Sequence, residues 1–271
     1  MEPSFLDDVK QAARAWRGSW LMPGFYVLYA ALSAIAVAVT PEPPSHCGQK
    51  TFDGRCPVRP DQVHPVLLLS LLVLPFGIFQ VGMSGTLRVW YVRRFQGKDL
   101  TPGDVWSMTW KFWGRFFVLG LLFLLVSLPW VIAYLVALAD GSDTAGLVIL
   151  LAGTVVSDVL LTFVVPGLAL YQPGVGASVK GGLAVLRSTW PACSLYALIP
   201  PLALSLLGRG AGRGHFKALA LLGALTGPPL TLLFAGATVA FLLRRFPPMS
   251  ENGSLGYLPP RRVPDLRVPR A

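Results

Sequence analysis

The chain has 271 residues, of which 54% are hydrophobic and only 13% are charged, and its mean hydropathy is +0.59. Soluble domains carry about 25% charged residues, so this composition excludes a soluble enzyme, a disordered chain and a fibrous protein. The net charge is +10, but Lys and Arg gather in the cytoplasmic loops of membrane proteins, and here they lie beside apolar segments. We therefore predict an all-α integral membrane protein that does not bind nucleic acid.

Six apolar stretches are long enough to cross a bilayer, which takes about 20 residues. In chain order they cover residues 20–40, 66–92, 116–138, 146–171, 191–207 and 218–243. The first is not a cleavable signal peptide, because its apolar run is too long and a patterned helix precedes it. The segments between the stretches are too short to fold alone. We predict one domain of six transmembrane helices over residues 1–246 and an extended, basic, Pro-rich tail over residues 247–271.

The distribution of Lys and Arg predicts the orientation of these spans. Seventeen of the 23 Lys and Arg residues lie on the same side of the predicted membrane as the N-terminus, and six lie on the other side. An excess of positive charge marks the cytoplasmic side. We therefore expect both the N-terminus and the C-terminus in the cytoplasm.

A short amphipathic segment precedes each odd-numbered span, and all three segments lie on the predicted cytoplasmic side. The first begins at Ser4, with Asp7 at the third position of a capping box, and extends to Trp16. The second begins at Thr101 with a proline in its first turn, and the third runs from residue 177 to Trp190. We predict three repeated hairpin units, each made of an interfacial amphipathic helix, an outward span and an inward span.

Aromatic and basic side chains gather where these segments meet the spans. Residues 106–113 hold three tryptophans, and two inward spans end alike, in Arg-Arg-Phe at residues 93–95 and 244–246. Side chains of this kind contact anionic headgroups at a membrane interface, or a partner subunit. The residues that we predict to make these contacts are Trp16, Arg93, Arg94, Trp106, Trp110, Lys111, Trp113, Arg115, Arg244 and Arg245.

Three stretches of the sequence resemble a known family. They are Gly82-Met-Ser-Gly-Thr-Leu-Arg88 with Phe95-Gln-Gly97, Val165-Pro166-Gly-Leu-Ala-Leu, and Gly181-Gly-Leu-Ala-Val-Leu-Arg187-Ser188. Together they resemble the six-helix bacterial membrane domain that is fused to glycerophosphodiester phosphodiesterases, and they are also similar to the YesL-like proteins encoded near bacterial sugar-uptake systems. The resemblance covers roughly residues 80–200. It implies six helices in a bacterial inner membrane and no catalytic residue. The long external loop with two cysteines departs from the YesL-like pattern.

Asp158 is the only acidic residue well inside a predicted span. An ionised carboxylate at the bilayer centre costs about 2.5–3.5 kcal/mol on insertion scales. Thr154 and Thr162 lie one helical turn on either side, where their hydroxyls are able to reach the carboxyl group. Two interpretations stay open. One is a proton- or cation-coupled transport site that faces the bundle interior, and the other is a protonated carboxyl that bonds helices together.

Every predicted span contains proline, and the last two contain the pairs Pro200-Pro201 and Pro228-Pro229. Interior prolines free backbone carbonyls, which line substrate sites in some transporters, but they also serve only to bend helices within a bundle. Gly223 and Gly227 precede the second pair at GxxxG spacing. From this spacing we expect close packing of spans five and six.

The predicted external loop over residues 41–65 holds Cys47 and Cys56. Because this loop faces an oxidising compartment, we predict one disulfide between these cysteines. The alternative is a zinc site that adds His46 and His64, but the spacing matches no established zinc pattern, and we expect no metal.

The sequence lacks the motifs of phosphate loops, GxSxG hydrolases, HExxH proteases and CxxC redox proteins, and it has no paired intramembrane carboxylates. We therefore expect a non-enzymatic membrane component without a cofactor, a transport-associated or lipid-handling subunit that contacts membrane lipids. Two alternatives remain. One is a secondary transporter that is coupled through Asp158, and the other is the membrane subunit of an ABC-type exporter whose residues 106–113 dock on an ATPase.

Overall fold

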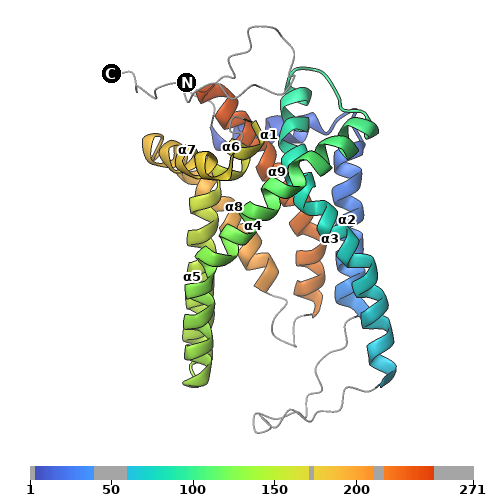
Figure 1. The fold of residues 1–271 in the computed structure, drawn as a ribbon, viewed down its shortest axis with the longest axis vertical. Helices are drawn as coiled ribbons and strands as arrows, with labels where there is room; N and C mark the ends of the chain where they lie inside the picture. The colour runs from blue at the N-terminus through green and yellow to red at the C-terminus, as the bar shows by residue number, and fades with distance from the viewer. Residues whose placement is uncertain (1–3, 40–59, 171–173, 210–216, 247–271) are drawn as a thin grey trace.

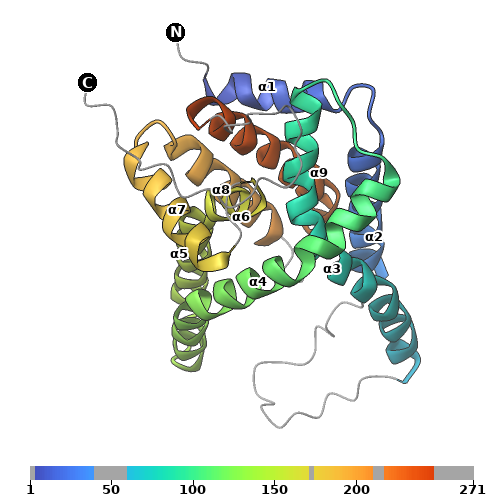
Figure 2. The same cartoon turned by 45° about the horizontal axis from the view of Figure 1, so that its top comes forward.

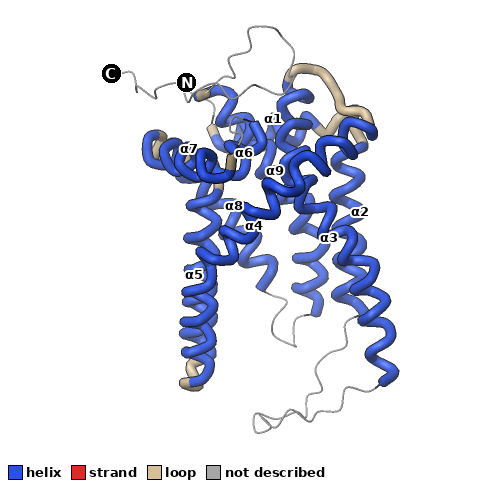
Figure 3. The backbone as a smooth tube through the Cα atoms, viewed as in Figure 1, coloured by secondary structure: helices blue, strands red, loops and turns tan. Residues whose placement is uncertain are grey.

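The computed structural model describes residues 4–39, 60–170, 174–209 and 217–246, and these ranges form helices and no strand (Figure 3). Cys47 and Cys56 fall between residues 40 and 59, and the predicted tail follows residue 246. The predicted disulfide, the alternative zinc site and the predicted tail therefore lie outside the described residues.

Nine helices cover the described part of the chain. They are α1 (Phe5–Ala15), α2 (Leu21–Val39), α3 (Pro60–Phe95), α4 (Pro102–Ala139), α5 (Asp143–Leu161), α6 (Val164–Leu170), α7 (Val175–Ser188), α8 (Ser194–Arg209) and α9 (Lys217–Arg245). Six of them, α2, α3, α4, α5, α8 and α9, alternate in direction along the length of the molecule, and α4 crosses it diagonally (Figure 1). Helices α1 and α7 lie across one end.

Within the described ranges, four segments are long and apolar enough to cross a membrane, and they are Leu21–Ala38, Pro102–Ala137, Thr144–Leu170 and Ala220–Arg245. The all-helical prediction is thus confirmed for the described ranges, and four of the predicted spans have the length and composition that a membrane requires. Helices α3 and α8 occupy the positions of the other two predicted spans, and the apolar part of α8 is the shorter segment Ser194–Leu204. Six spans in three repeated hairpins stay a prediction.

The helix boundaries correct two details of the predicted units. The Trp-rich segment is not a separate interfacial helix, because it forms the start of α4, one unbroken helix of 38 residues. Gly114 is the only weak helix former where the two segments join, and a single interior glycine costs a helix about 1 kcal/mol. The fourth predicted span is divided into α5 and α6 at Thr162 and Phe163. Pro166 cannot bond to the carbonyl of Thr162 four residues earlier, which favours a break there.

Two reciprocal capping boxes fix the starts of α1 and α4. In the first, the Asp7 amide donates to Ser4 Oγ over 3.3 Å, and the Ser4 amide donates to Asp7 Oδ2 over 2.9 Å. In the second, the Asp104 amide donates to Thr101 Oγ1 over 3.2 Å, and the Thr101 amide donates to Asp104 Oδ2 over 3.1 Å. Both helix starts that the sequence predicts are confirmed. Each box satisfies two backbone donors that a helix start leaves open.

The largest core cluster lies where α1, α2, α3 and α9 meet, with Trp90 and Tyr91 of α3 fully buried at its centre. Figure 2 shows α1 crossing beside α9 and the end of α3. Glycine permits this contact, since a Cβ on Gly236 would lie 2.5 Å from the Tyr91 ring and 2.6 Å from the Cβ of Ala12. Gly227 has no described atom within 4 Å of such a Cβ. Helices α8 and α9 do pack against each other, as expected for spans five and six, but Gly227 itself faces a cavity and not a close helix contact.

Candidate functional site

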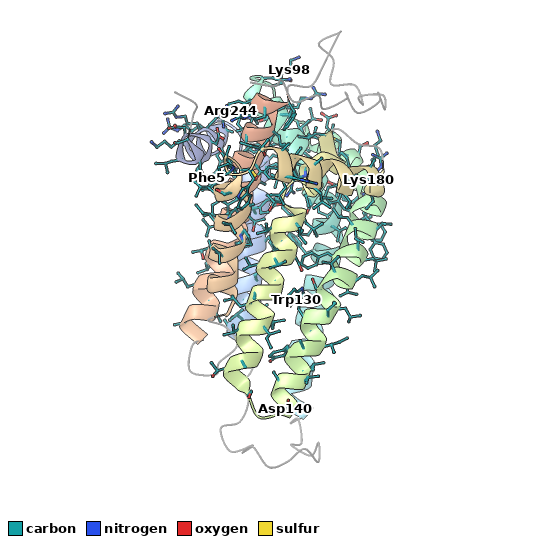
Figure 4. The ribbon with its side chains drawn as sticks, turned by 90° about the vertical axis from the view of Figure 1, so that its left-hand side faces the viewer. Phe5, Lys98, Trp130, Asp140, Lys180 and Arg244 are labelled. Atoms are coloured by element: carbon teal, nitrogen blue, oxygen red, sulfur yellow. The ribbon has the colours of Figure 1, made fainter. Side chains whose placement is uncertain are left out.

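Basic side chains mark one end of the bundle, which we call the basic end. It comprises α1, α7 and the C-terminal ends of α3 and α9. Lys98, Lys180 and Arg244 lie at this end, whereas Asp140 lies at the opposite end, and Trp130 lies between the two (Figure 4). Three basic residues thus lie at the end that the predicted orientation assigns to the cytoplasm, and the orientation itself stays a prediction.

Part of the predicted interfacial set is exposed at the start of α4. Trp106 and Trp110 are 59% and 47% exposed, and Lys111 beside them is exposed as well. The two indole rings lie 5.6 Å apart, and the ring of Phe79 stacks on Trp106 at 5.6 Å. Trp113 is held more tightly, because its Nε1 donates to the carbonyl of Ile78 over 2.9 Å. These rings form an aromatic surface across α3 and α4.

Other predicted interfacial residues turn inward and join α1 to α3. Trp16 Nε1 donates to the Tyr91 hydroxyl over 2.8 Å. Arg94 Nε donates to the carbonyl of Ala15 over 3.0 Å, and its Nη1 lies 3.7 Å from Asp99 Oδ2. These side chains serve contacts within the chain. Of the remaining predicted contacts, Arg245 is exposed, whereas Arg93 and Arg115 are partly buried.

Arg244 also has a partner within the chain, and sequence reasoning missed that partner. The carboxylate of Asp8, which is 1% exposed, accepts from Arg244 Nη2 and from the hydroxyl of Tyr196. Burial raises the pKa of Asp8, and the Tyr196 hydrogen bond and the Arg244 charge oppose this rise. The available signal was helical spacing, because Asp8 shares the buried face of α1 with Ala12 and Ala15. The trio ties α1 to α8 and α9.

Asp158 lies on α5 within the candidate span Thr144–Leu170 and is partly buried. The hydroxyl of Thr162 donates over 2.8 Å to the backbone carbonyl of Asp158, and the hydroxyl of Thr154 donates to the carbonyl of Leu150. Within the described ranges no hydrogen bond or ion pair reaches the Asp158 carboxyl group. The structure thus shows a carboxyl in an apolar helix without the interhelical bond that one interpretation requires.

A cavity of about 330 Å³ lies between α2, α3, α8 and α9. Its polar wall is formed by Tyr26, Tyr29, Ser33, Gln80 and Thr231, and its apolar wall by Leu204, Ala224, Gly227 and Pro228. Because a proline has no amide hydrogen, Pro228 leaves the carbonyl of Ala224 without its helical donor. Hydroxyl and amide groups thus line one part of a cavity whose accessible surface is otherwise mostly apolar.

Gln80 and Arg88 of α3 give this part of the bundle its unusual chemistry. Gln80 Nε2 donates to the Tyr26 hydroxyl over 3.4 Å, while its Oε1 is buried with no hydrogen-bond partner among the described residues. Arg88 is partly buried, donates to the carbonyl of Ser84, and has no carboxylate within 4 Å in the described ranges. Its charge interacts with the phenols of Tyr26 and Tyr91.

Arg88 is one of the seventeen basic residues that were counted on the predicted cytoplasmic side, whereas the structure places it partly buried within the bundle. Its position within the apolar stretch of residues 66–92 was the signal for this. In the part of the chain that the structure describes, no three His, Cys, Asp or Glu side chains come together as metal ligands.

Comparison with known proteins finds no matching family model, no similar curated protein and no similar solved structure. The resemblance to the six-helix bacterial membrane domain and to the YesL-like proteins therefore stays a prediction. Function has to be argued from the geometry of this chain.

Proposed function

We propose that this chain is a non-enzymatic integral membrane protein that binds and handles anionic lipids of a bacterial inner membrane, with its basic end in the cytoplasm. The observation that carries this proposal is the exposed Trp106, Trp110 and Lys111 at the start of α4. Tryptophan prefers the headgroup level of a bilayer. Each Lys or Arg near an anionic surface contributes about 1 kcal/mol of attraction.

The surface of α4 supports this proposal because its chemistry changes along the helix. Beyond Phe117 the exposed side chains are aliphatic, and Leu124 and Leu125 are 63% and 64% exposed. Aliphatic side chains suit acyl chains, whereas Trp and Lys suit headgroups. One continuous helix would thus pass from the headgroup region to the hydrocarbon core, with Lys111 close to the boundary.

A fluorescence experiment tests the lipid preference. The protein is reconstituted in phosphatidylcholine vesicles that contain a small fraction of brominated phosphatidylglycerol or brominated phosphatidylethanolamine, and quenching of tryptophan fluorescence is compared. We expect stronger quenching by the anionic lipid, a smaller difference in Lys111→Gln, and loss of the difference at high salt. The variant Asp140→Asn at the opposite end is the control that keeps the preference. Equal quenching by both lipids in the wild type would exclude lipid handling at this surface.

The second candidate function is a proton- or cation-coupled secondary transporter, and the carboxyl of Asp158, which has no bonded partner among the described residues, favours it. Carboxylates inside membrane helices commonly mark proton and ion pathways. In proteoliposomes that contain the wild type, an imposed proton gradient should drive uptake of the transported substrate. Asp158→Asn should abolish this uptake, and the control variant Asp140→Asn should leave it intact. For the ABC-exporter alternative, residues 106–113 belong to the long α4, and no observation favours an ATPase docking there.

A further inference from the structure

We propose that the cavity between α2, α3, α8 and α9 binds a small hydroxylated oxyanion, with Arg88 balancing its charge and Gln80 accepting a hydrogen bond from its hydroxyl group. Glycerol phosphate is one small compound of this class. The inference rests on the proposed function in one respect, because the headgroup of an anionic lipid is one source of this chemistry. A free polyol phosphate is the other source.

The charge of Arg88 is the first reason. Long basic side chains near the end of a membrane helix normally turn toward water. Arg88 turns the other way, because its guanidinium donates to the carbonyl of Ser84, one turn deeper in the bundle. A cation in this position without a carboxylate is strongly unfavourable. Arginine carries five N–H donors in a planar fork that fits an oxyanion, and Arg88 uses one of its nitrogens in the bond to Ser84.

The unpaired oxygen of Gln80 is the second reason. A buried amide oxygen without a donor is destabilising, and among the described residues Gln80 Oε1 has no donor while its Nε2 bonds to Tyr26. An amide oxygen repels a bare anion, so it requires a donor such as a hydroxyl group on the bound molecule. Tyr29, Ser33 and Thr231 add further hydroxyl groups to the same wall. The ligand therefore needs an anionic part and a hydroxyl part.

The geometry of α3 indicates that the anionic part and the hydroxyl part belong to one ligand molecule. Gln80, Ser84 and Arg88 follow one another at intervals of four residues, so they lie along one side of the helix. Arg88 turns toward Ser84, and its charge interacts with the phenol of Tyr26, which lines the cavity. The cavity, at about 330 Å³, lies at the small end of the range for ligand sites, about 300–1,000 Å³. It suits a headgroup and not a pair of acyl chains.

Binding is measured on the purified full chain in detergent by calorimetric titration and by the shift of its thermal midpoint. The probes are glycerol 3-phosphate, dihexanoyl phosphatidylglycerol, glycerol, phosphocholine and sodium chloride. We expect binding of at least one of the first two probes and at least about tenfold weaker binding of glycerol and phosphocholine, each of which lacks one of the two parts. Binding of glycerol 3-phosphate indicates a free phosphate ester as the source, and binding of the lipid alone indicates a headgroup. Stabilisation by sodium alone, or by none of the probes, would overturn the proposal.

Paired variants locate the site. Arg88→Gln and Gln80→Leu should each weaken binding at least about tenfold, while Arg88→Lys keeps part of the affinity and provides a folded variant if Arg88→Gln does not fold. Lys98→Gln and Gln96→Leu remove the same groups from exposed positions near the end of the same helix and should bind like the wild type. Wild-type affinity in both Arg88→Gln and Gln80→Leu would refute the assignment. The variant Lys111→Gln separates the two proposals, because it weakens the lipid preference at the surface and leaves binding in the cavity unchanged.

Discussion

Two arginines of this chain, Arg244 and Arg88, differ in whether a carboxylate compensates their charge. Arg244, at the basic end, bonds to a carboxylate that is 1% exposed and lies near the hydroxyl of Tyr196. Arg88, deeper in the bundle, bonds to a backbone carbonyl and has no carboxylate near it in the described ranges. The first arginine has its counter-ion within the fold. The second interacts electrostatically with the phenol of Tyr26, which lines a cavity together with Gln80, whose amide oxygen has no partner among the described residues.

The presence or absence of a counter-ion distinguishes Arg244, which has a structural role, from Arg88, to which we assign a role in binding. A charge that is buried with a bonded partner holds elements together, and its removal leaves the partner unsatisfied. A charge that is buried without a partner lowers the stability of the empty protein, so its presence calls for a ligand or a functional role. Four predictions test whether the two regions differ in this way.

The largest expected effect follows the removal of Asp8. Asp8→Ala should lower the free energy of unfolding by about 2–3 kcal/mol, below the range for a fully buried pair, because the Arg244 side chain is 32% exposed. Unfolding in mixed micelles, followed by circular dichroism, measures the loss. In the background of Arg244→Met, the same substitution should cost clearly less. An equal cost in both backgrounds would show that the two side chains do not act together.

Replacing each arginine by methionine compares the two regions directly. Arg244→Met should lower the free energy of unfolding by about 1–2 kcal/mol, because it leaves Asp8 buried without its cation. Arg88→Met should leave the stability of the ligand-free protein unchanged or raise it by up to about 1 kcal/mol, since it removes an unpaired cation. Thermal midpoints in one detergent provide the comparison. A loss at Arg88 as large as that at Arg244 would contradict the distinction.

Substitution of Asp158 should change the stability as little as substitution of Arg88 does, and much less than substitution of Asp8. Its carboxyl has no bonded partner within the described part of the chain, so Asp158→Asn should change the free energy of unfolding by less than about 0.5 kcal/mol. Thermal unfolding of the two proteins side by side measures the difference. A large destabilisation would reveal a structural bond and would weaken the transporter alternative.

The smallest effect concerns the capping box of α1. The hydrogen bonds to Ser4 hold the pKa of Asp7 below its ordinary value of 3.8. Because the pKa of Asp7 is lower in the folded protein, its carboxylate stabilises the fold fully above its ordinary pKa of 3.8. This stabilisation is lost as the pH falls through the lowered pKa. Asp7→Asn should therefore lower the thermal midpoint slightly at pH 6, and the two midpoints should converge in acid. A difference that persists at low pH would show that the charge is not responsible.

Local signals in the sequence were sufficient for much of the fold. The apolar stretches located α2 and α9, and the capping boxes at Ser4 and Thr101 marked the starts of α1 and α4. The break before Pro166 also has a local cause, but the prediction of one continuous span over residues 146–171 missed it. The unbroken course of α4 through Gly114 was missed, because one glycine does not outweigh the helix formers around it.

The candidate site was only partly accessible from the sequence. Trp106 and Trp110 were expected at a surface and are exposed there. The roles of Asp8 and Arg88 depend on which helices pack together, and hydropathy patterns do not contain that information. Gln80 gave no sequence signal at all, because an unpaired amide oxygen is a property of the folded core.

Native mass spectrometry of the gently solubilised wild type, with no ligand added, tests the central claim most directly. We predict a retained molecule at one copy per chain, with the mass of an anionic lipid or a polyol phosphate. Arg88→Gln should lose it, and Lys98→Gln should keep it. A wild type without any retained mass, or equal retention in Arg88→Gln, would contradict the claim that the unpaired cation beside the cavity serves a ligand.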